Sequence, residues 1–169
     1  EAFTCLAEGS RYDKSEPKLD READGRLVWG WKSRTDPVGP AQEKELIGAG
    51  KIAEGEARYR LRDVDTGKYV GLHSGSFCWN QFRKRWIMIG VEVGGASYLG
   101  EVWFAESDQP VGPWRWAKKI VTHRQYSFYN PTQHPFFDQE GGRVVYFEGT
   151  YCATFSGNPC PTPRYDYNQ

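Results

Sequence analysis

The sequence lacks the patterns that mark several large functional classes. It has no glycine-rich phosphate loop and no nucleophile elbow, and its four cysteines include no C-x-x-C pair. It therefore gives no sign of a nucleotide site, a serine hydrolase or a zinc centre, and we expect no metal ligands of that kind. No stretch approaches the roughly 20 apolar residues that a membrane helix needs, so we expect no membrane partner.

An excess of charge of either sign is also absent. Lys and Arg number 22, as do Asp and Glu, so nothing favours a nucleic acid partner. The chain begins at Glu1 with no visible leader, and we expect a processed, trimmed or partial product whose compartment stays open. Cys152 and Cys160 flank a Gly/Pro-rich loop and could bridge in an oxidising compartment.

Aromatic residues, in contrast, are abundant. They make up 15% of the chain, with seven Trp and ten Tyr. Large flat side chains fill the space between packed sheets, and they also stack on sugar faces. We expect the packing role for most of them.

An arginine-led apolar phrase recurs three times at almost constant spacing. The phrases begin at Arg26 (RLVWGW), Arg85 (RWIMIG) and Arg143 (RVVYFE), 59 and 58 residues apart, and each follows a short apolar run and a polar turn. Strand-rich repeats of roughly 40 to 60 residues are typical of propeller blades. We therefore expect each arginine to begin the second strand of an antiparallel blade.

The predicted fold class is all-β, with β-propeller blades of four-stranded antiparallel sheets and a small helical insertion. One partial propeller domain, 1–169, would hold blades at about 15–72, 73–122 and 130–169, with the insertion at about 40–58. About two and a half to three blades cannot close a ring, which typically needs about four to eight. We expect a ring of five, with the remaining blades supplied by missing sequence or another chain.

Local signals place the elements within these blades. Pro40 at a first helical position, with Gly48 and Gly50 as stop signals, predicts a helix through Ile47. The predicted strands of the second blade are 74–79, 85–93, 98–106 and 114–122. The third blade would begin with strands at 132–137 and 143–149.

The sequence VWFAESD at 102–108, followed by VGPW at 111–114, resembles a recurrent strand hairpin of the five-bladed propeller glycosidases. That superfamily includes arabinanases, β-xylosidases and fructosidases, and uncharacterised bacterial members are similar also at 130–135 and 161–169. The resemblance implies a glycoside-hydrolase-like propeller that acts on or binds polysaccharide, and it favours a secreted or periplasmic location. The alternative is a non-catalytic carbohydrate-binding or scaffold propeller.

The resemblance also suggests a catalytic residue. The general acid of the arabinanase and xylosidase group is a Glu in an E-G-P triplet, and Glu8-Gly9-Ser10 is the similar triplet here, with Ser in place of Pro. A donor carboxyl needs a raised pKa, which partial burial can supply. The catalytic base and a modulating Asp would lie upstream of Glu1, so we expect this chain alone to be inactive. An ordinary loop position is the alternative for Glu8.

Candidate ligand-binding residues lie where innermost strands are expected. They are His73, Trp79, Tyr129, Asn130, Gln133 and His134. Imidazoles and amides bind sugar hydroxyls, and aromatic rings stack on sugars. We expect the histidines and amides to face one shared cavity with His134 nearest the axis. The resemblance allows a structural calcium ion near His134 as the only cofactor. Structural imidazoles, turn formation and core packing are the alternatives.

Overall fold

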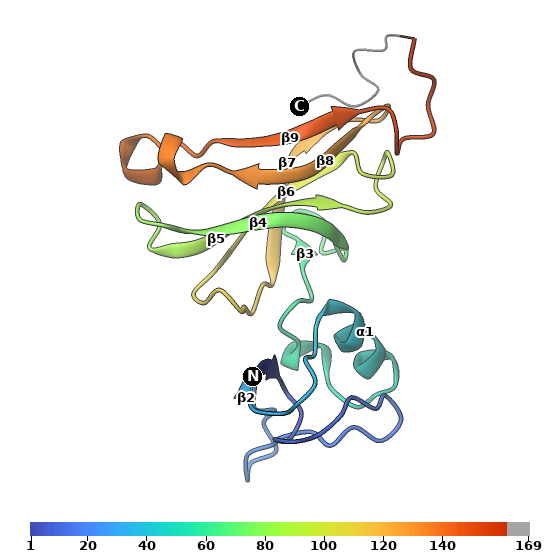
Figure 1. The fold of residues 1–169 in the computed structure, drawn as a ribbon, viewed down its shortest axis with the longest axis vertical. Coiled ribbons are helices and arrows are strands. Elements are labelled where there is room, and N and C mark those ends of the chain that lie inside the picture. Colours follow the sequence, from blue (N-terminus) through green and yellow to red (C-terminus); the bar gives the residue numbers. More distant parts are fainter. Residues whose placement is uncertain (162–169) are drawn as a thin grey trace. The chain divides into compact units, whose positions relative to one another are not determined.

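The chain forms two compact units, and the computed structural model describes residues 1–161 (Figure 1). The N-terminal unit comprises Glu1–Arg60, and the C-terminal unit begins at Leu61. Several separate sheets make the molecule mostly β, consistent with the predicted all-β class. No sheet closes on itself within the described residues.

The N-terminal unit has little regular structure. Strands β1 (Ala2–Thr4) and β2 (Gly30–Lys32) pair antiparallel, and helix α1 (Pro40–Gly48) and the 3-10 turn η1 (Glu54–Glu56) follow. The predicted helix is confirmed. Pro40 occupies its first turn, where a missing N–H costs nothing, and Gly50 follows its end with a φ of 67°.

A small apolar core holds this unit together. Its buried members are Cys5, Leu6, Val38, Leu46 and Ile52. The helix also buries Glu43, whose carboxylate accepts hydrogen bonds from the backbone N–H groups of Arg58 and Tyr59. Burial raises the pKa of this carboxyl, and the two hydrogen bonds oppose that rise.

The first arginine-led phrase does not form a blade strand. Arg26 lies in a turn, because the Asp24 carboxylate accepts both its backbone N–H at 3.0 Å and its Nε at 2.8 Å. Leu27 then makes one isolated bridge, to Arg21, and regular strand resumes only at Gly30. The prediction for Arg26 is therefore wrong, and residues 15–72 do not form one four-stranded sheet.

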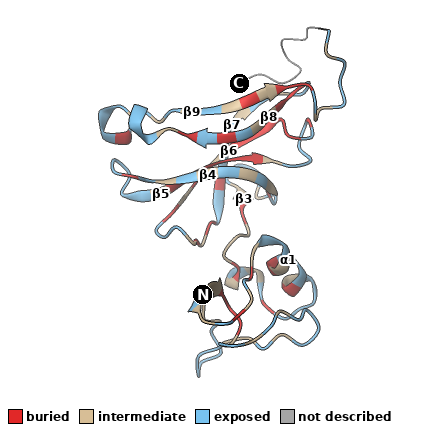
Figure 2. Cartoon of the chain, in the orientation of Figure 1, coloured by how far each residue is buried: buried red, intermediate tan, exposed pale blue. Residues whose placement is uncertain are grey.

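The C-terminal unit is built on a five-stranded sheet. Its strands are β3 (Arg62–Asp63), β4 (Leu72–Asn80), β5 (Arg85–Glu92), β6 (Glu101–Ser107) and β7 (Trp116–Thr122), in the order β3-β7-β6-β5-β4. Consecutive strands from β4 to β7 pair antiparallel, as predicted, and β3 adds to β7 in parallel. Strand β6 is buried along most of its length (Figure 2).

Side chains alternate between the two faces of this sheet. One row across it, from β4 to β7, contains Ser76, Ile89, Phe104 and Lys118. The next row, on the opposite face, contains Phe77, Met88, Ala105 and Ala117. We call the face that carries Ser76 the inner face, and the face that carries Phe77 the aromatic face.

A second hairpin, β8 (Ser127–Gln133) and β9 (Phe147–Cys152), lies alongside β4 (Figure 1). The hydroxyl of Ser74 donates to Asn130 Oδ1 at 3.1 Å, and Ser76 Oγ accepts the backbone N–H of Gln133 at 2.7 Å. Both contacts come from the inner face, and the residue numbers increase in the same direction along β4 and β8. Strands β4 and β8 therefore run in the same direction.

The third arginine-led phrase begins later than predicted. Strand β8 ends at Gln133 because Pro135 lacks an N–H for the ladder, and 3-10 turns follow at Pro135–Phe137 and Glu140–Gly142. Arg143 adopts the helical conformation at the end of the second turn, and β9 starts only at Phe147. Of the three arginines, Arg85 alone begins a strand. The similar stretch at 161–169 lies outside the described residues except for Pro161.

Asn80 should be essential for holding the two hairpins together. Its buried Nδ2 donates to the carbonyl of Gly142 at 2.7 Å, and its Oδ1 accepts the backbone N–H of Arg83 at 2.8 Å. We expect Asn80→Ala to lower the free energy of unfolding by about 1 to 3 kcal/mol, because these backbone groups lose their partner. Hydrogen–deuterium exchange in β4 and β8 would measure the loss. The exposed Gln109→Ala is the control, and equal exchange in both variants would contradict this role.

Candidate functional site

The start of β4 and the middle of β8 bring three predicted ligand-binding residues together. The ring of His73 stacks on Tyr129 with centroids 5.8 Å apart and planes at 28°. Asn130 follows Tyr129 at a β-bulge with a φ of 51°, a conformation that Asn tolerates, and contacts Ser74. His73 and Asn130 are exposed. The three residues therefore form one open polar and aromatic surface, and their binding of a sugar stays a prediction.

Gln133 has a structural role. Its side chain is buried against the inner face, where Nε2 donates to the carbonyl oxygens of Ser76 at 2.9 Å and Ile87 at 3.4 Å. Both donors of a glutamine amide are on this nitrogen. In the structure this amide fastens β8 to β4 and β5, and its binding of a sugar hydroxyl stays a prediction.

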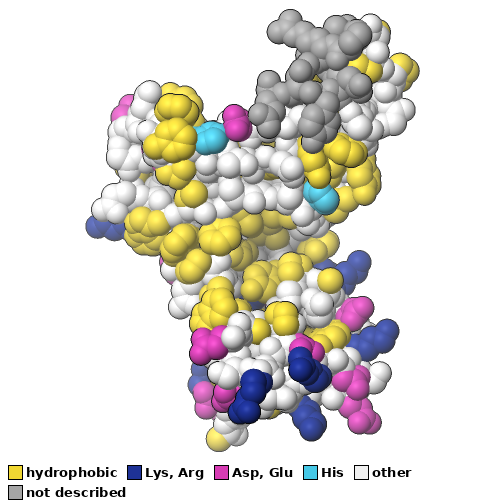
Figure 3. Space-filling view, in the orientation of Figure 1, with side chains coloured by type: hydrophobic (Ala, Val, Ile, Leu, Met, Phe, Trp, Pro, Cys, Tyr) yellow, Lys and Arg dark blue, Asp and Glu magenta, His cyan; other side chains and the backbone are white. Residues whose placement is uncertain are grey.

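His134 has different neighbours from His73. Its Nε2 lies 3.1 Å from Oε1 of Glu148, and its ring contacts Phe136 with centroids 5.3 Å apart. Figure 3 shows a histidine and an acidic side chain next to hydrophobic side chains on this hairpin. Glu148 is therefore the charged neighbour of this histidine. No contact joins the two histidines into the expected shared cluster within residues 1–161.

Glu8 lies in the N-terminal unit. It occupies an exposed turn, and its Oε1 accepts the backbone N–H of Ser33 at 3.4 Å. A general acid of the expected kind depends on partial burial, which this position does not supply. The catalytic role of Glu8 therefore stays a prediction without structural support.

Trp79 belongs to an exposed group of rings on the aromatic face. The side chains of Phe77 and Trp79 are 53% and 46% exposed, and each meets Trp86 edge-on with centroids 6.0 Å apart. The Nε1 of Trp79 donates to Gln81 Oε1 at 3.1 Å, which fixes the indole. Sequence reasoning found only Trp79. Two signals could have found the other rings. Phe77 lies two residues before Trp79 on the same strand, and Trp86 is expected opposite Trp79 across a short hairpin.

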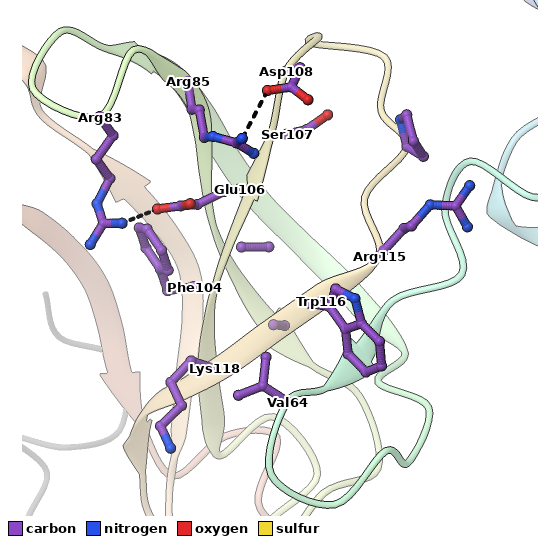
Figure 4. A pocket seen from close by; sticks show the side chains of 13 residues that line it. Val64, Arg83, Arg85, Phe104, Glu106, Ser107, Asp108, Arg115, Trp116 and Lys118 are labelled. Atoms are coloured by element: carbon purple, nitrogen blue, oxygen red, sulfur yellow. Dashed lines mark hydrogen bonds and ion pairs between the residues drawn. The ribbon is translucent and has the colours of Figure 1, made fainter.

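A cleft of about 500 Å³ opens on the inner face of β6 and β7 (Figure 4). Phe104, Glu106 and Arg83 lie along one side, and Arg115 and Trp116 lie along the other. The two strands place Phe104 and Lys118 in one cross-strand pair. Sequence reasoning missed this cleft, because its residues come from separate turns and strands.

Ion pairs hold the charged side chains of the cleft. Arg83 contacts Glu106 and lies over the ring of Phe104, with 5.2 Å from Cζ to the centroid. Arg85 lies 3.3 Å from Asp108. Lys118 contacts Asp65, which lies outside the lining, at 2.6 Å. The pairs of Arg85 and Lys118 are exposed to solvent, where such pairs contribute little stability. They orient the cations around the cleft.

Two carboxylates lie close together where β5 ends and β6 begins. Glu101 is fully buried and its Oε1 accepts the N–H of Ala96 at 2.8 Å, while its Oε2 packs against Gly95. Glu92 Oε2 accepts the indole N–H of Trp103 at 2.8 Å. Burial raises the pKa of Glu92, and the nearby Glu101 adds to the rise. Glu101 is closed to solvent, and its Oε2 has no hydrogen-bond partner among the described residues.

His123 forms a structural link between β7 and β9. Its Nδ1 accepts the backbone N–H groups of Gln125 and Tyr126, at 3.1 and 2.8 Å. Nδ1 therefore carries no proton, and Nε2 donates to the hydroxyl of Tyr151 at 2.7 Å. The histidine is held as one neutral tautomer within a group of aromatic rings.

Other kinds of site find no support in the part of the chain described. Residues 1–161 contain no group of three or more His, Cys, Asp or Glu side chains that could hold a metal ion, including near His134. No described helix is both long and apolar enough to cross a membrane. No protein-family model, curated protein or solved structure matches the chain.

The raised pKa of Glu92 predicts that the stability of the fold depends on pH. A carboxyl whose pKa is higher in the folded state destabilises the fold as the pH rises. The loss of stability begins near the ordinary pKa of the group, 4.5, and continues through its folded pKa. Glu92→Gln keeps an acceptor for Trp103 but carries no charge. We expect this variant to be more stable than the native chain above that range, and the gain to shrink as the pH falls below it.

Urea unfolding between pH 4 and pH 8 measures the difference. Glu140→Gln, which removes an exposed carboxyl paired with Arg143, is the control. A gain for Glu92→Gln that does not change with pH would show that desolvation of the charged form is not its cause.

Proposed function

We propose that the C-terminal unit binds carbohydrate as part of a glycoside-hydrolase-like β-propeller. The observation that carries the proposal is the ring group of Phe77, Trp79 and Trp86 on the aromatic face. Aromatic faces stack on the apolar faces of sugar rings, and a group held by a regular sheet loses little conformational entropy on binding. Phe77 and Trp79 are 53% and 46% exposed in the described residues, and the proposal requires that a neighbouring blade leave them open.

The arrangement of strands supports the propeller part of the proposal. The β4–β7 antiparallel meander has the strand order of a blade, and β8 runs beside β4 in the same direction. Innermost strands of neighbouring blades have this relation. In this interpretation β8 and β9 are the first two strands of the next blade, and further blades come from outside residues 1–169.

Binding is better supported than hydrolysis by this chain. Glycoside hydrolysis needs two carboxyl groups on either side of the scissile bond. Glu8 is exposed in the N-terminal unit, and Glu101 is buried beneath Gly95. We therefore assign a hydrolytic role, with Glu8 as general acid, only to a larger protein that supplies the second carboxylate.

The ring group should decide carbohydrate affinity. We expect Trp79→Ala to weaken binding of arabinan, xylan or fructan oligosaccharides about tenfold, since loss of a stacked ring costs about 1 to 1.5 kcal/mol. Titration calorimetry measures the dissociation constants. Trp31→Ala is the matched control, because Trp31 is also an exposed tryptophan, in the N-terminal unit. Equal losses in both variants, or no binding by the native chain, would contradict the proposal.

The chain alone should not hydrolyse these polysaccharides. The resemblance to the propeller glycosidases places the catalytic base and the modulating Asp upstream of Glu1, which is the reason for this expectation. Reducing-end assays on purified protein measure turnover. Turnover that Glu8→Gln abolishes would show instead that the chain carries a complete catalytic pair.

A further inference from the structure

We propose that the cleft on the inner face binds the carboxylate-bearing ring of an acidic sugar, such as a uronate. This inference rests on the proposed carbohydrate binding and names a class of ligand for a second site. The cleft is formed wholly by the C-terminal unit, from β6, β7 and the loop between them, the β4–β5 turn with the first residue of β5, and the residue after β3. Its volume, about 500 Å³, is in the range of small-molecule sites.

Positive charge exceeds negative charge around the cleft. Four cationic side chains line it, Arg83, Arg85, Arg115 and Lys118, against Glu106 and Asp108 in the lining and Asp65 beside Lys118. A bound carboxylate would bring the balance closer to neutral. Guanidinium groups suit this ligand because they can donate two parallel hydrogen bonds to one carboxylate.

The cations can turn toward a ligand at small cost. The Arg85 pair uses one guanidinium nitrogen, Nη2, at 3.3 Å from an Asp108 side chain that is 79% exposed. Lys118 and Asp65 are likewise more than half exposed. Exposed pairs of this kind are worth only about 0 to 1 kcal/mol and are screened by salt. A ligand carboxylate can therefore share or replace the present partners.

Flat apolar side chains supply the contact for a ring. Trp116 is 55% exposed at the cleft, and Phe104 lies on the neighbouring strand beneath Arg83. Figure 4 shows the indole of Trp116 on the side opposite Phe104. A ligand with both a ring face and a carboxylate would use the indole and the cations together. A simple inorganic anion would use only the cations.

The test compares trigalacturonate with its methyl ester, which has the same rings and linkages but no charge. We expect chain 1–169 to bind the acid at least about tenfold more tightly than the ester, and added salt to weaken the acid alone. Arg85→Gln with Lys118→Gln, and separately Trp116→Ala, should each weaken the acid about tenfold. Arg124→Gln, an exposed arginine in the turn after β7, is the control and should change nothing.

Each other outcome has a distinct meaning. Equal affinity for acid and ester, or equal losses in the cleft and control variants, would overturn the cleft assignment. Tighter binding of inorganic phosphate than of trigalacturonate would overturn the sugar ring as the ligand. Trp79→Ala tests the opposite face: if it weakens neutral oligosaccharides while the cleft variants leave the acid unaffected, the cleft proposal fails and the carbohydrate proposal stands. If only the cleft variants act, the ring group fails instead.

Discussion

The structure of the C-terminal unit depends on the polar seam between β4 and β8. Ser74, Ser76 and Asn80 alternate along the inner face of β4, and each one bonds to β8 or to the turn after it. Hydroxyl and amide groups allow hydrogen bonds of fixed geometry between strands that share no backbone ladder. The seam therefore fixes both the position and the direction of the second hairpin. Buried donors without partners would cost free energy, and the amide nitrogens of Asn80 and Gln133 both donate to backbone carbonyls.

The same seam separates two surfaces with different chemistry. Because β8 lies along β4, it covers one part of the inner face and leaves the part on β6 and β7 open as the cleft. The aromatic face is shaped by a different constraint. Gly75 and Gly90 pair across β4 and β5, and a Cβ on Gly75 would come within 2.4 Å of the carbonyl oxygen of Ile89. Small residues at this point keep the two strands close, next to the exposed rings.

Sequence reasoning succeeded where local pattern and tertiary structure agree. The helix beginning at Pro40 has clear start and stop signals, the strands from β4 to β7 are apolar runs separated by turns, and the structure confirms them. It failed where similar phrases meet different neighbours. The backbone N–H of Arg26 donates to Asp24, and Arg143 follows turns that begin at Pro135. Only Arg85 therefore begins a strand.

The candidate sites were predictable only in part, for a related reason. His73, Tyr129 and Asn130 were found because they precede or lie in strands that the pattern already defined. Gln133 has the same sequence context but faces the sheet, and a one-residue difference in alternation decides between a buried and an exposed amide. The cleft has no local signal. Its cations come from two separate stretches, 83–85 and 115–118, and the register that places Phe104 opposite Lys118 is set by the sheet.

The two surfaces would contribute differently to recognition in the proposed function. Stacking on the rings of Phe77, Trp79 and Trp86 is tolerant of sugar identity, because most pyranose and furanose rings have an apolar face. The cleft responds to charge, since its cations gain a partner only from an acidic ligand. Affinity for a polysaccharide would then come mainly from the aromatic face, and discrimination between neutral and acidic chains from the inner face. Because the two surfaces lie on opposite sides of one sheet, a substitution on either should act independently of the other.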